Sequence, residues 1–411
     1  MATTVTVSER GRFISVFLFF AFSLWAWPAY PQSSQETGNN QRPRRVTTIE
    51  SSSSPITGAT TNVTEEVEEG EVVRVDTRLV SVPATVADTS GRPLSTLRAE
   101  NFELFEDGQK QTIANFSASD APFEIALLLD TSASTQADIA LIKSAAKVFI
   151  EGLHPNDRLA IIAFNTMNQG ATVAARVDVL TELTANQRTL ERAIQDLGSS
   201  RGTPLYDALD QIAEMFHQQR PREEVRGRQA IVALTDGVDS SSSIEFSQVR
   251  AKILAYGLAC YFINVNTEDL VEDRFLKDCD DPGHLTLSAK QLQRYRRTFV
   301  PTARPEDYES FCQLGSFERM DISRQLYNLA RWQMNDLAKS TGASNFDAAS
   351  LSDARAAFAQ LAAELGTQYS LGYYPTNKTP DGKFRLIRVQ VRGVDGEPHV
   401  RAREGYYAPS L

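Results

Sequence analysis

The stretch Ile125-Ala126-Leu127-Leu128-Leu129-Asp130-Thr131-Ser132-Ala133-Ser134 decides the fold of this chain. Its first five residues are all apolar, as in a parallel strand that is buried on both faces. The run then ends in one carboxylate and two alternate hydroxyls, those of Asp130, Ser132 and Ser134. Open α/β sheets bind ligands in the crevice beyond the carboxyl ends of their strands, and Mg²⁺ prefers hard oxygen ligands. The stretch therefore predicts a cation site at the end of a buried strand.

The D-x-S-x-S motif alone is weak evidence for a cation site, because average composition produces it by chance in roughly 1 in 10 chains of this length. Two later loops support the site. Thr203, in Gly202-Thr203-Pro204, opens a segment with apolar residues at helical spacing. Asp236, in Thr235-Asp236-Gly237, follows the apolar run 230–234. The alternative for each of these positions is a helix N-cap, in which Ser, Thr or Asp satisfies backbone amides and binds nothing else.

The order strand, DxSxS, loop threonine, strand, TDG resembles the metal-ion-dependent adhesion site of the von Willebrand factor type A domain. This resemblance implies that Ser132, Ser134 and Thr203 are hydroxyl ligands and that Asp130 and Asp236 act mostly through coordinated water. The implied ion is Mg²⁺, with Mn²⁺ or Ca²⁺ as alternatives. The implied partner is a protein that presents an Asp or Glu side chain, because a metal held mainly by neutral hydroxyls keeps its positive charge and still accepts a carboxylate.

The segments around these motifs alternate between strand and helix patterns, which predicts an α/β fold with a doubly wound, mainly parallel sheet. Further strands are expected at 159–164, 230–234 and 260–265, with a polar, hairpin-like segment after the first of them. We assign this domain to residues 121–366.

The flanks of this domain, residues 71–120 and 367–411, show period-two alternation and turn residues instead. Val80, Val82, Ala84 and Val86 alternate with other residues, and Asp-Gly pairs mark turns. Neither flank alone has enough strands for a secure core. We therefore expect the flanks to pair into one small β-sandwich-like module, with the α/β domain inserted between them.

The N-terminal part indicates export. Arg10 and Arg12 precede an apolar run and small residues, as in a secretory signal peptide spanning residues 1–30. Trp27 stands where a small residue is expected for cleavage after Ala29, so an uncleaved anchor is the alternative, and it would be the only membrane contact. Residues 31–70 are polar and predict a disordered linker. The expected location is secreted or periplasmic, at the cell envelope.

The segment at about 268–320 is an insertion relative to a plain type A domain. It holds Cys279 and Cys312, which would form a disulfide in an oxidising compartment, whereas Cys260 is expected in the core. The arginine-rich stretch 293–297 is expected on a solvated face. The sequence leaves open whether the insertion selects partners or is a loop without a function.

Composition and motifs favour a binding protein over an enzyme. The net charge of −10 argues against nucleic-acid binding. Residues 198–202 match G-x-S-x-G, but they follow a predicted helix, whereas the hydrolase nucleophile lies between a strand and a helix. Hydroxyl ligands without an added general base also disfavour metal catalysis.

The whole arrangement, including the C-terminal residues 401–409, resembles the exported VWFA-related proteins of acidobacteria. That family carries no defined activity. The expected function is therefore a cation-dependent adhesion-type module; the alternative is a structural or assembly protein of the cell envelope with a vestigial metal site.

Overall fold

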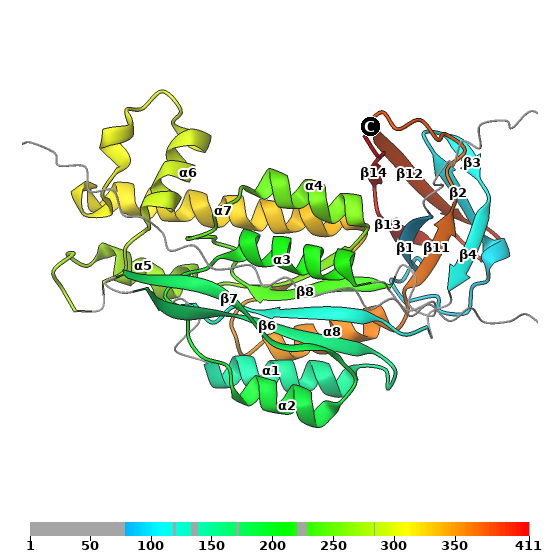
Figure 1. Ribbon diagram of the computed structural model, residues 1–411, viewed down its shortest axis with the longest axis horizontal. Helices are drawn as coiled ribbons and strands as arrows, with labels where there is room; N and C mark the ends of the chain where they lie inside the picture. The colour runs from blue at the N-terminus through cyan, green and yellow to red at the C-terminus, as the bar shows by residue number, and fades with distance from the viewer. Residues whose placement is uncertain are drawn as a thin grey trace, which may run out of the picture. The chain divides into compact units, whose positions relative to one another are not determined.

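The structure is a computed structural model that describes residues 79–117, 121–132, 139–169, 172–219, 228–282 and 284–410 (Figure 1). The expected signal peptide or anchor at 1–30 and the linker at 31–70 lie outside the described residues. Across the described ranges, no helix combines the length and the apolar character needed to cross a bilayer.

A six-stranded sheet forms the centre of the α/β domain, in the order β10-β9-β8-β5-β6-β7. Every neighbouring pair is parallel except β6 and β7, which are antiparallel. The strands are β5 (Glu124–Leu129), β6 (Arg158–Gln169), β7 (Thr172–Thr184), β8 (Gln229–Thr235), β9 (Ala259–Val265) and β10 (Asn345–Ala348). The predicted fold class, a mainly parallel α/β sheet, is confirmed.

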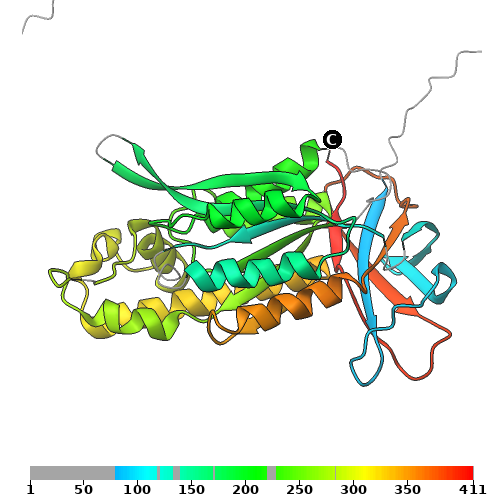
Figure 2. The same cartoon turned by 90° about the horizontal axis from the view of Figure 1, so that it is seen from below.

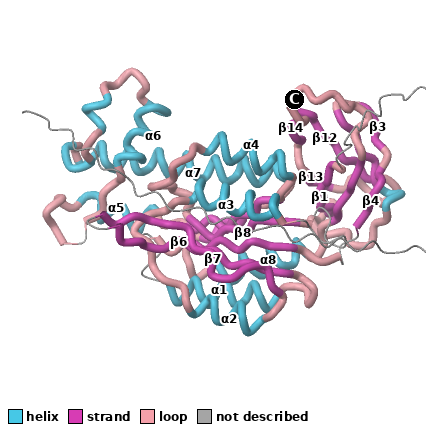
Figure 3. The backbone as a smooth tube through the Cα atoms, in the orientation of Figure 1, coloured by secondary structure: helices cyan, strands magenta, loops and turns pink. Residues whose placement is uncertain are grey.

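Helices cover both faces of this sheet, which explains the unbroken apolar run in β5 (Figures 1 and 3). Successive side chains of a strand point to opposite faces. Ile125, Leu127 and Leu129 therefore pack in one core, and Ala126 and Leu128 in the other. The first core is closed by α1 (Ile139–Gly152), α2 (Gln187–Gln195) and α8 (Ala354–Leu365), and the second by α3 (Leu205–Gln218), α4 (Phe246–Tyr256) and α7 (Ser316–Thr341).

The segment expected to be a polar hairpin is a pair of long strands. β6 extends five residues beyond the predicted end of the strand at residue 164. β7 pairs with it from Leu159 to Gln169. Figure 2 shows the two strands as a long hairpin along one edge of the sheet. The apolar signal of β7 is weak because an edge strand is only partly covered, and Val179 is 41% exposed.

The two flanks form two four-stranded sheets that share one apolar core. The first has the order β13-β1-β11-β4 and the second β14-β12-β2-β3. β1 pairs with β11 and β2 with β12, so each sheet combines strands from before and after the α/β domain. The strands are β1 (Val80–Ala87), β2 (Phe102–Glu106), β3 (Gln109–Gln111), β4 (Ile113–Ser117), β11 (Tyr369–Tyr373), β12 (Phe384–Val391), β13 (His399–Ala402) and β14 (Gly405–Tyr407), with a 3-10 helix at Ala99–Asn101.

The chain leaves the sandwich-like module after β4 and returns to it in β11, and these two strands are hydrogen-bonded to each other. The α/β domain is therefore inserted between two neighbouring strands of one sheet. The last strand was expected near Val400, whereas the structure adds β14, whose three residues are too few to show alternation. The buried Arg403 links the two parts: its guanidinium donates to the carbonyl oxygens of Leu254 at 2.6 Å and Ser81 at 3.1 Å.

The insertion contains α5 (Glu268–Leu276), α6 (Ala289–Phe299) and short 3-10 helices at Pro305–Tyr308 and Phe311–Gln313, and it ends where α7 begins. Cys279 and Cys312 form the expected disulfide. Residues from α5, α6 and α7 share a separate apolar cluster. Cys260 lies fully buried in β9, as expected, and burial raises the pKa of its thiol.

Candidate metal site

Asp130 lies directly after β5 and is completely buried. Its backbone amide donates to the carbonyl oxygen of Leu234, 2.9 Å away at the end of β8. Its Oδ1 accepts from the amide of Ser132 at 3.0 Å, and its Oδ2 accepts from the hydroxyl of Thr235 at 2.6 Å. The Ser132 hydroxyl also bonds to this carboxylate. The ends of two adjacent strands thus fix the position of the carboxylate.

Asp236 follows β8 and is 2% exposed. Its Oδ1 accepts from the amide of Val238 at 3.0 Å, and its Oδ2 accepts from the hydroxyl of Thr267 at 2.7 Å. The Thr267 hydroxyl lies 2.8 Å from the hydroxyl of Tyr327 on α7. The second carboxylate is therefore held by its own loop and by Thr267, which in turn contacts Tyr327 on α7.

Thr203 lies in the loop before α3. Hydrogen bonds join this loop to the loop after β5 and to the loop after β8. The Thr203 amide donates to the Ser240 hydroxyl at 2.8 Å, and the Thr203 carbonyl accepts from the Ser240 amide at 3.0 Å. In the same loop, the Ser200 amide donates to the carbonyl oxygen of Thr131 at 2.8 Å. The structure thus places Asp130, Ser132, Thr203 and Asp236 on three connected loops, while Ser134 lies outside the described residues.

The two carboxylates are close enough to influence each other. Burial, and then the negative charge of Asp236, raise the pKa of Asp130 to about 7, and the hydrogen bonds from Ser132 and Thr235 act in the opposite direction. Two buried carboxylates disfavour each other's ionised form. A divalent cation beside them would offset that repulsion.

The oxygen chemistry of these residues fits Mg²⁺. A carboxylate oxygen has two lone pairs, so one hydrogen bond does not exhaust its capacity. The Thr203 side chain makes no hydrogen bond to any residue in the described ranges. Among the described residues, no three His, Cys, Asp or Glu side chains gather as a metal-binding group. Hydroxyls with two carboxylates suit a hard ion such as Mg²⁺ and lack the nitrogen and sulfur ligands of structural zinc.

Several residues of this network were not predicted. Thr235 and Thr267 lie at or just beyond the carboxyl ends of β8 and β9. They could have been found in the same way as Asp130 and Asp236, as polar residues that follow a buried strand. Tyr327 and Ser240 carry no such signal, because distant segments bring them into contact.

The hydrolase-like motif lies in the loop between α2 and α3, and no strand precedes it within that connection. The Ser200 hydroxyl is buried and donates to the carbonyl oxygen of Gly202 at 2.7 Å. This serine therefore acts as part of the loop that positions Thr203.

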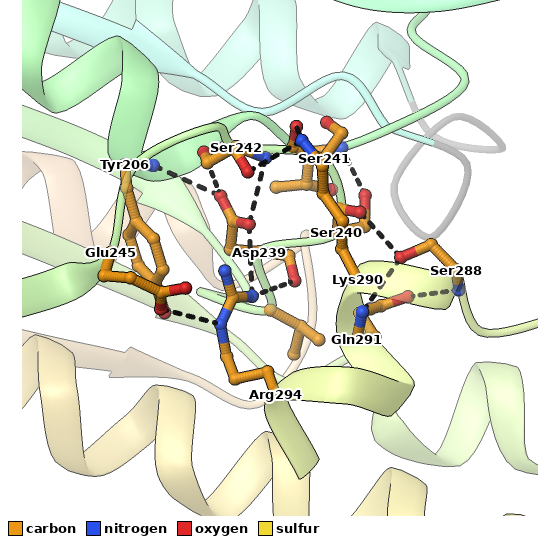
Figure 4. Close-up of polar contacts among 12 residues, drawn as sticks. Tyr206, Asp239, Ser240, Ser241, Ser242, Glu245, Ser288, Lys290, Gln291 and Arg294 are labelled. Atoms are coloured by element: carbon orange, nitrogen blue, oxygen red, sulfur yellow. Dashed lines mark hydrogen bonds and ion pairs between the residues drawn. The ribbon is translucent and has the colours of Figure 1, made fainter. Parts of the chain in front are cut away.

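The arginine-rich stretch was expected on a solvated face, and for Arg294 this expectation is wrong. Arg294 is 8% exposed, and its Nη1 lies 3.2 Å from Oδ1 of the buried Asp239 (Figure 4). The pairing compensates two charges removed from water. The neighbouring Arg297 is exposed, as expected.

A cavity of about 950 Å³ lies elsewhere among the described residues. It is bordered by the end of α4 and by C-terminal residues such as Tyr406 and Pro409. Asp130, Ser132, Thr203 and Asp236 do not line it.

Several known structures show a distant resemblance to this chain. They include "von Willebrand factor type A from Catenulispora acidiphila", with 11% identity and a TM-score of 0.38 over 77% of this chain and 76% of that one. The pilus adhesin SpaC from Lactobacillus rhamnosus GG, in an open conformation, has 11% identity and a TM-score of 0.36 over 78% and 49%. The SpRpn10 VWA domain has 17% identity and a TM-score of 0.28 over 35% and 75%.

The sequence match is more specific. No curated protein matches the chain. Residues 125–239, however, match the family model of the von Willebrand factor type A domain. The matched range begins in β5 and ends just after Asp236, so it contains all three loops described above. Residues 125–239 of this chain are thus similar to the von Willebrand factor type A domain, and the mainly parallel α/β fold of this part of the chain agrees with that match.

Proposed function

We propose that this chain is an exported protein-binding module whose contact with its partner depends on a divalent cation. Mg²⁺, or else Mn²⁺ or Ca²⁺, would be held by Asp130, Ser132, Ser134, Thr203 and Asp236. The observation that carries the proposal is the convergence of three loops: Thr235 bonds to Asp130, Ser240 to Thr203, and Ser200 to Thr131.

Binding fits this chemistry better than catalysis. Three hydroxyls, with the two carboxylates acting mostly through coordinated water, leave a bound cation with room for another oxygen ligand. An Asp or Glu side chain of a protein partner would supply that ligand. Within the described residues, no histidine side chain hydrogen-bonds to Asp130, Ser132, Thr203 or Asp236.

The cellular setting belongs to the same proposal. A signal peptide at 1–30 would export the chain, and the polar segment 31–70 would separate the folded part from any uncleaved anchor. The likeness to exported VWFA-related proteins of acidobacteria stays a prediction, as does the absence of enzymatic activity.

Calorimetric titration with Mg²⁺, Mn²⁺ and Ca²⁺ tests the metal site. We expect the wild-type protein to bind one ion, Asp130→Ala to lose binding, and Asp196→Ala to bind normally, because Asp196 is an exposed carboxylate at the end of α2. Asp130→Asn, which keeps the side-chain volume, separates loss of charge from loss of packing.

Equal binding in the wild-type protein and in Asp130→Ala would exclude this site. No binding in the wild-type protein would favour a structural or assembly role in the envelope with a vestigial site. Capture of partners from envelope extracts, with and without EDTA, then tests whether cation binding and protein binding depend on each other.

A further inference from the structure

The loop after β8 continues from Asp236 into the residues Asp239-Ser240-Ser241-Ser242-Ser243, which we call the serine loop. The serine loop caps α3. The residue before this helix is Pro204, which offers no capping side chain. The first amides of a helix need external acceptors, and here the amide of Tyr206 donates to Asp239 at 3.2 Å and that of Asp207 to Ser242 at 3.1 Å.

The serine loop therefore sets the position of Thr203. Ser240 exchanges two hydrogen bonds with Thr203, and the capped helix begins only two residues later. Asp236 lies three residues before the serine loop. A displacement of the serine loop would thus move two of the candidate metal ligands together.

The serine loop is itself held by the insertion, through side chains at the start of α6 (Figure 4). The Ser288 hydroxyl donates to the carbonyl oxygen of Ser240 at 2.6 Å. Lys290 Nζ donates to the carbonyl oxygens of Ser241 at 2.7 Å and Ser242 at 2.9 Å. Arg294 Nη1 donates to the carbonyl oxygen of Asp239 at 3.0 Å. Four consecutive carbonyls of the loop thus accept hydrogen bonds from one helix.

The spacing of Lys290 and Arg294 along α6 allows both side chains to reach the serine loop. Lys290 and Arg294 are four residues apart, which places them on the same face of a helix. The guanidinium of Arg294 also lies over the ring of Tyr206, with its central carbon 4.9 Å from the ring centroid. Arg294 therefore contacts both the serine loop and the helix that this loop caps.

The segment that carries α6 is anchored on its other side. The disulfide between Cys279 and Cys312 encloses α6 in the chain. Arg319 on α7 donates to the carbonyl oxygens of Cys312 at 3.0 Å and Lys277 at 3.4 Å, next to the two cysteines. Both ends of the disulfide-closed segment are thus fixed to the helix that packs on the sheet.

We propose that the disulfide-closed insertion positions the metal site, with Lys290 and Arg294 as the positioning residues. This inference rests on the proposed function, and it assigns a role to a segment outside the matched family range. The insertion does not supply a metal ligand; it holds the carbonyls of the serine loop so that Thr203 and Asp236 face the same ion.

The test compares Lys290→Met with Arg297→Met in the full chain. Both remove a cation from α6, but among the described residues Arg297 pairs with the carboxylate of Glu245, at 2.7 Å, and with none of the loop carbonyls. We expect Lys290→Met to weaken Mg²⁺ binding about fivefold, equivalent to about 1 kcal/mol. Arg297→Met should bind as the wild type does, and Lys290→Arg should restore affinity. The thermal midpoint of all three variants should stay near that of the wild type.

Hydrogen exchange provides a readout that needs no metal. Peptides covering 203–208 and 236–243 should exchange faster in Lys290→Met and at the wild-type rate in Arg297→Met. Wild-type Mg²⁺ affinity together with wild-type exchange in Lys290→Met would overturn the inference. If the wild-type protein binds no metal, the proposed function fails, and the exchange rates alone decide whether the insertion positions the loop.

Discussion

Replacing Gly237 by alanine tests how tightly the loop after β8, which carries Asp236, is packed. Gly237 follows Asp236 and has φ of +77°, a conformation that disfavours side chains. A Cβ at this position would lie 2.5 Å from Cε and 2.8 Å from Sδ of Met334 on α7. Met334 is 2% exposed, so its side chain has little room to move away. The substitution therefore combines backbone strain with overpacking.

The expected loss of stability follows from these two terms. The left-handed conformation costs an alanine roughly 1–2 kcal/mol. Overpacking a filled core adds typically about 1–3 kcal/mol. Gly91 is the matched control, because it has φ of +81° and a Cβ added there would meet no atom within 4 Å. We therefore expect Gly91→Ala to lose about 1 kcal/mol and Gly237→Ala about 3 kcal/mol.

Urea unfolding followed by tryptophan fluorescence measures this difference. A chain that begins at residue 31 keeps Trp332 as its single tryptophan, and Trp332 lies on α7 close to Met334 in the sequence. We also expect Gly237→Ala to weaken Mg²⁺ binding, because the strain falls next to Asp236. Equal losses in Gly237→Ala and Gly91→Ala would refute the claim that α7 constrains this loop.

Three further predictions concern other parts of the chain. Gly342→Ala should destabilise the protein by about 3 kcal/mol or more, because its Cβ would lie 2.5 Å from the backbone nitrogen of Arg403, which moves less readily than a side chain; urea unfolding measures this loss. Arg294→Met should cost about 3 kcal/mol by leaving the buried Asp239 without its cation, whereas Arg297→Met should cost well under about 1 kcal/mol in the same assay, since its ion pair is exposed; similar losses would contradict the burial of Arg294. The thiol of Cys260 should not react with a disulfide reagent at pH 8 until the protein is unfolded, because burial raises its pKa and keeps it protonated; fast labelling of the native protein would show that β9 is accessible.

The local sequence was sufficient for the main elements of the α/β domain. An unbroken apolar run can be buried on both faces only between two layers of helices, so Ile125–Leu129 indicated a central strand of a doubly wound sheet. Parallel strands place their carboxyl ends at one edge, so Asp130 and Asp236 could be expected near each other. Thr203 was identified because a loop hydroxyl precedes a helix with clear apolar periodicity.

Local patterns were not sufficient for the edges of the sheets. β7 is exposed along one side, and β14 is three residues long, so neither shows a strong alternation. We expected residues 71–120 and 367–411 to form one module together, because neither flank has enough strands to form a core alone. Which strands are neighbours, such as β1 with β11, depends on packing between residues almost 300 positions apart.

The sequence by itself was enough to predict which residues would form the candidate metal site, because strand ends and helix starts are encoded by patterns a few residues long. Only the tertiary structure decided how those residues are held. The hydrogen bond from Thr267 to Asp236, the one between Tyr327 and Thr267, and the carbonyls of the serine loop bonded by Lys290 and Arg294 join segments that local periodicity does not relate. The physical reason is that hydrogen bonds and ion pairs between distant segments depend on distances that exist only once the apolar cores have formed.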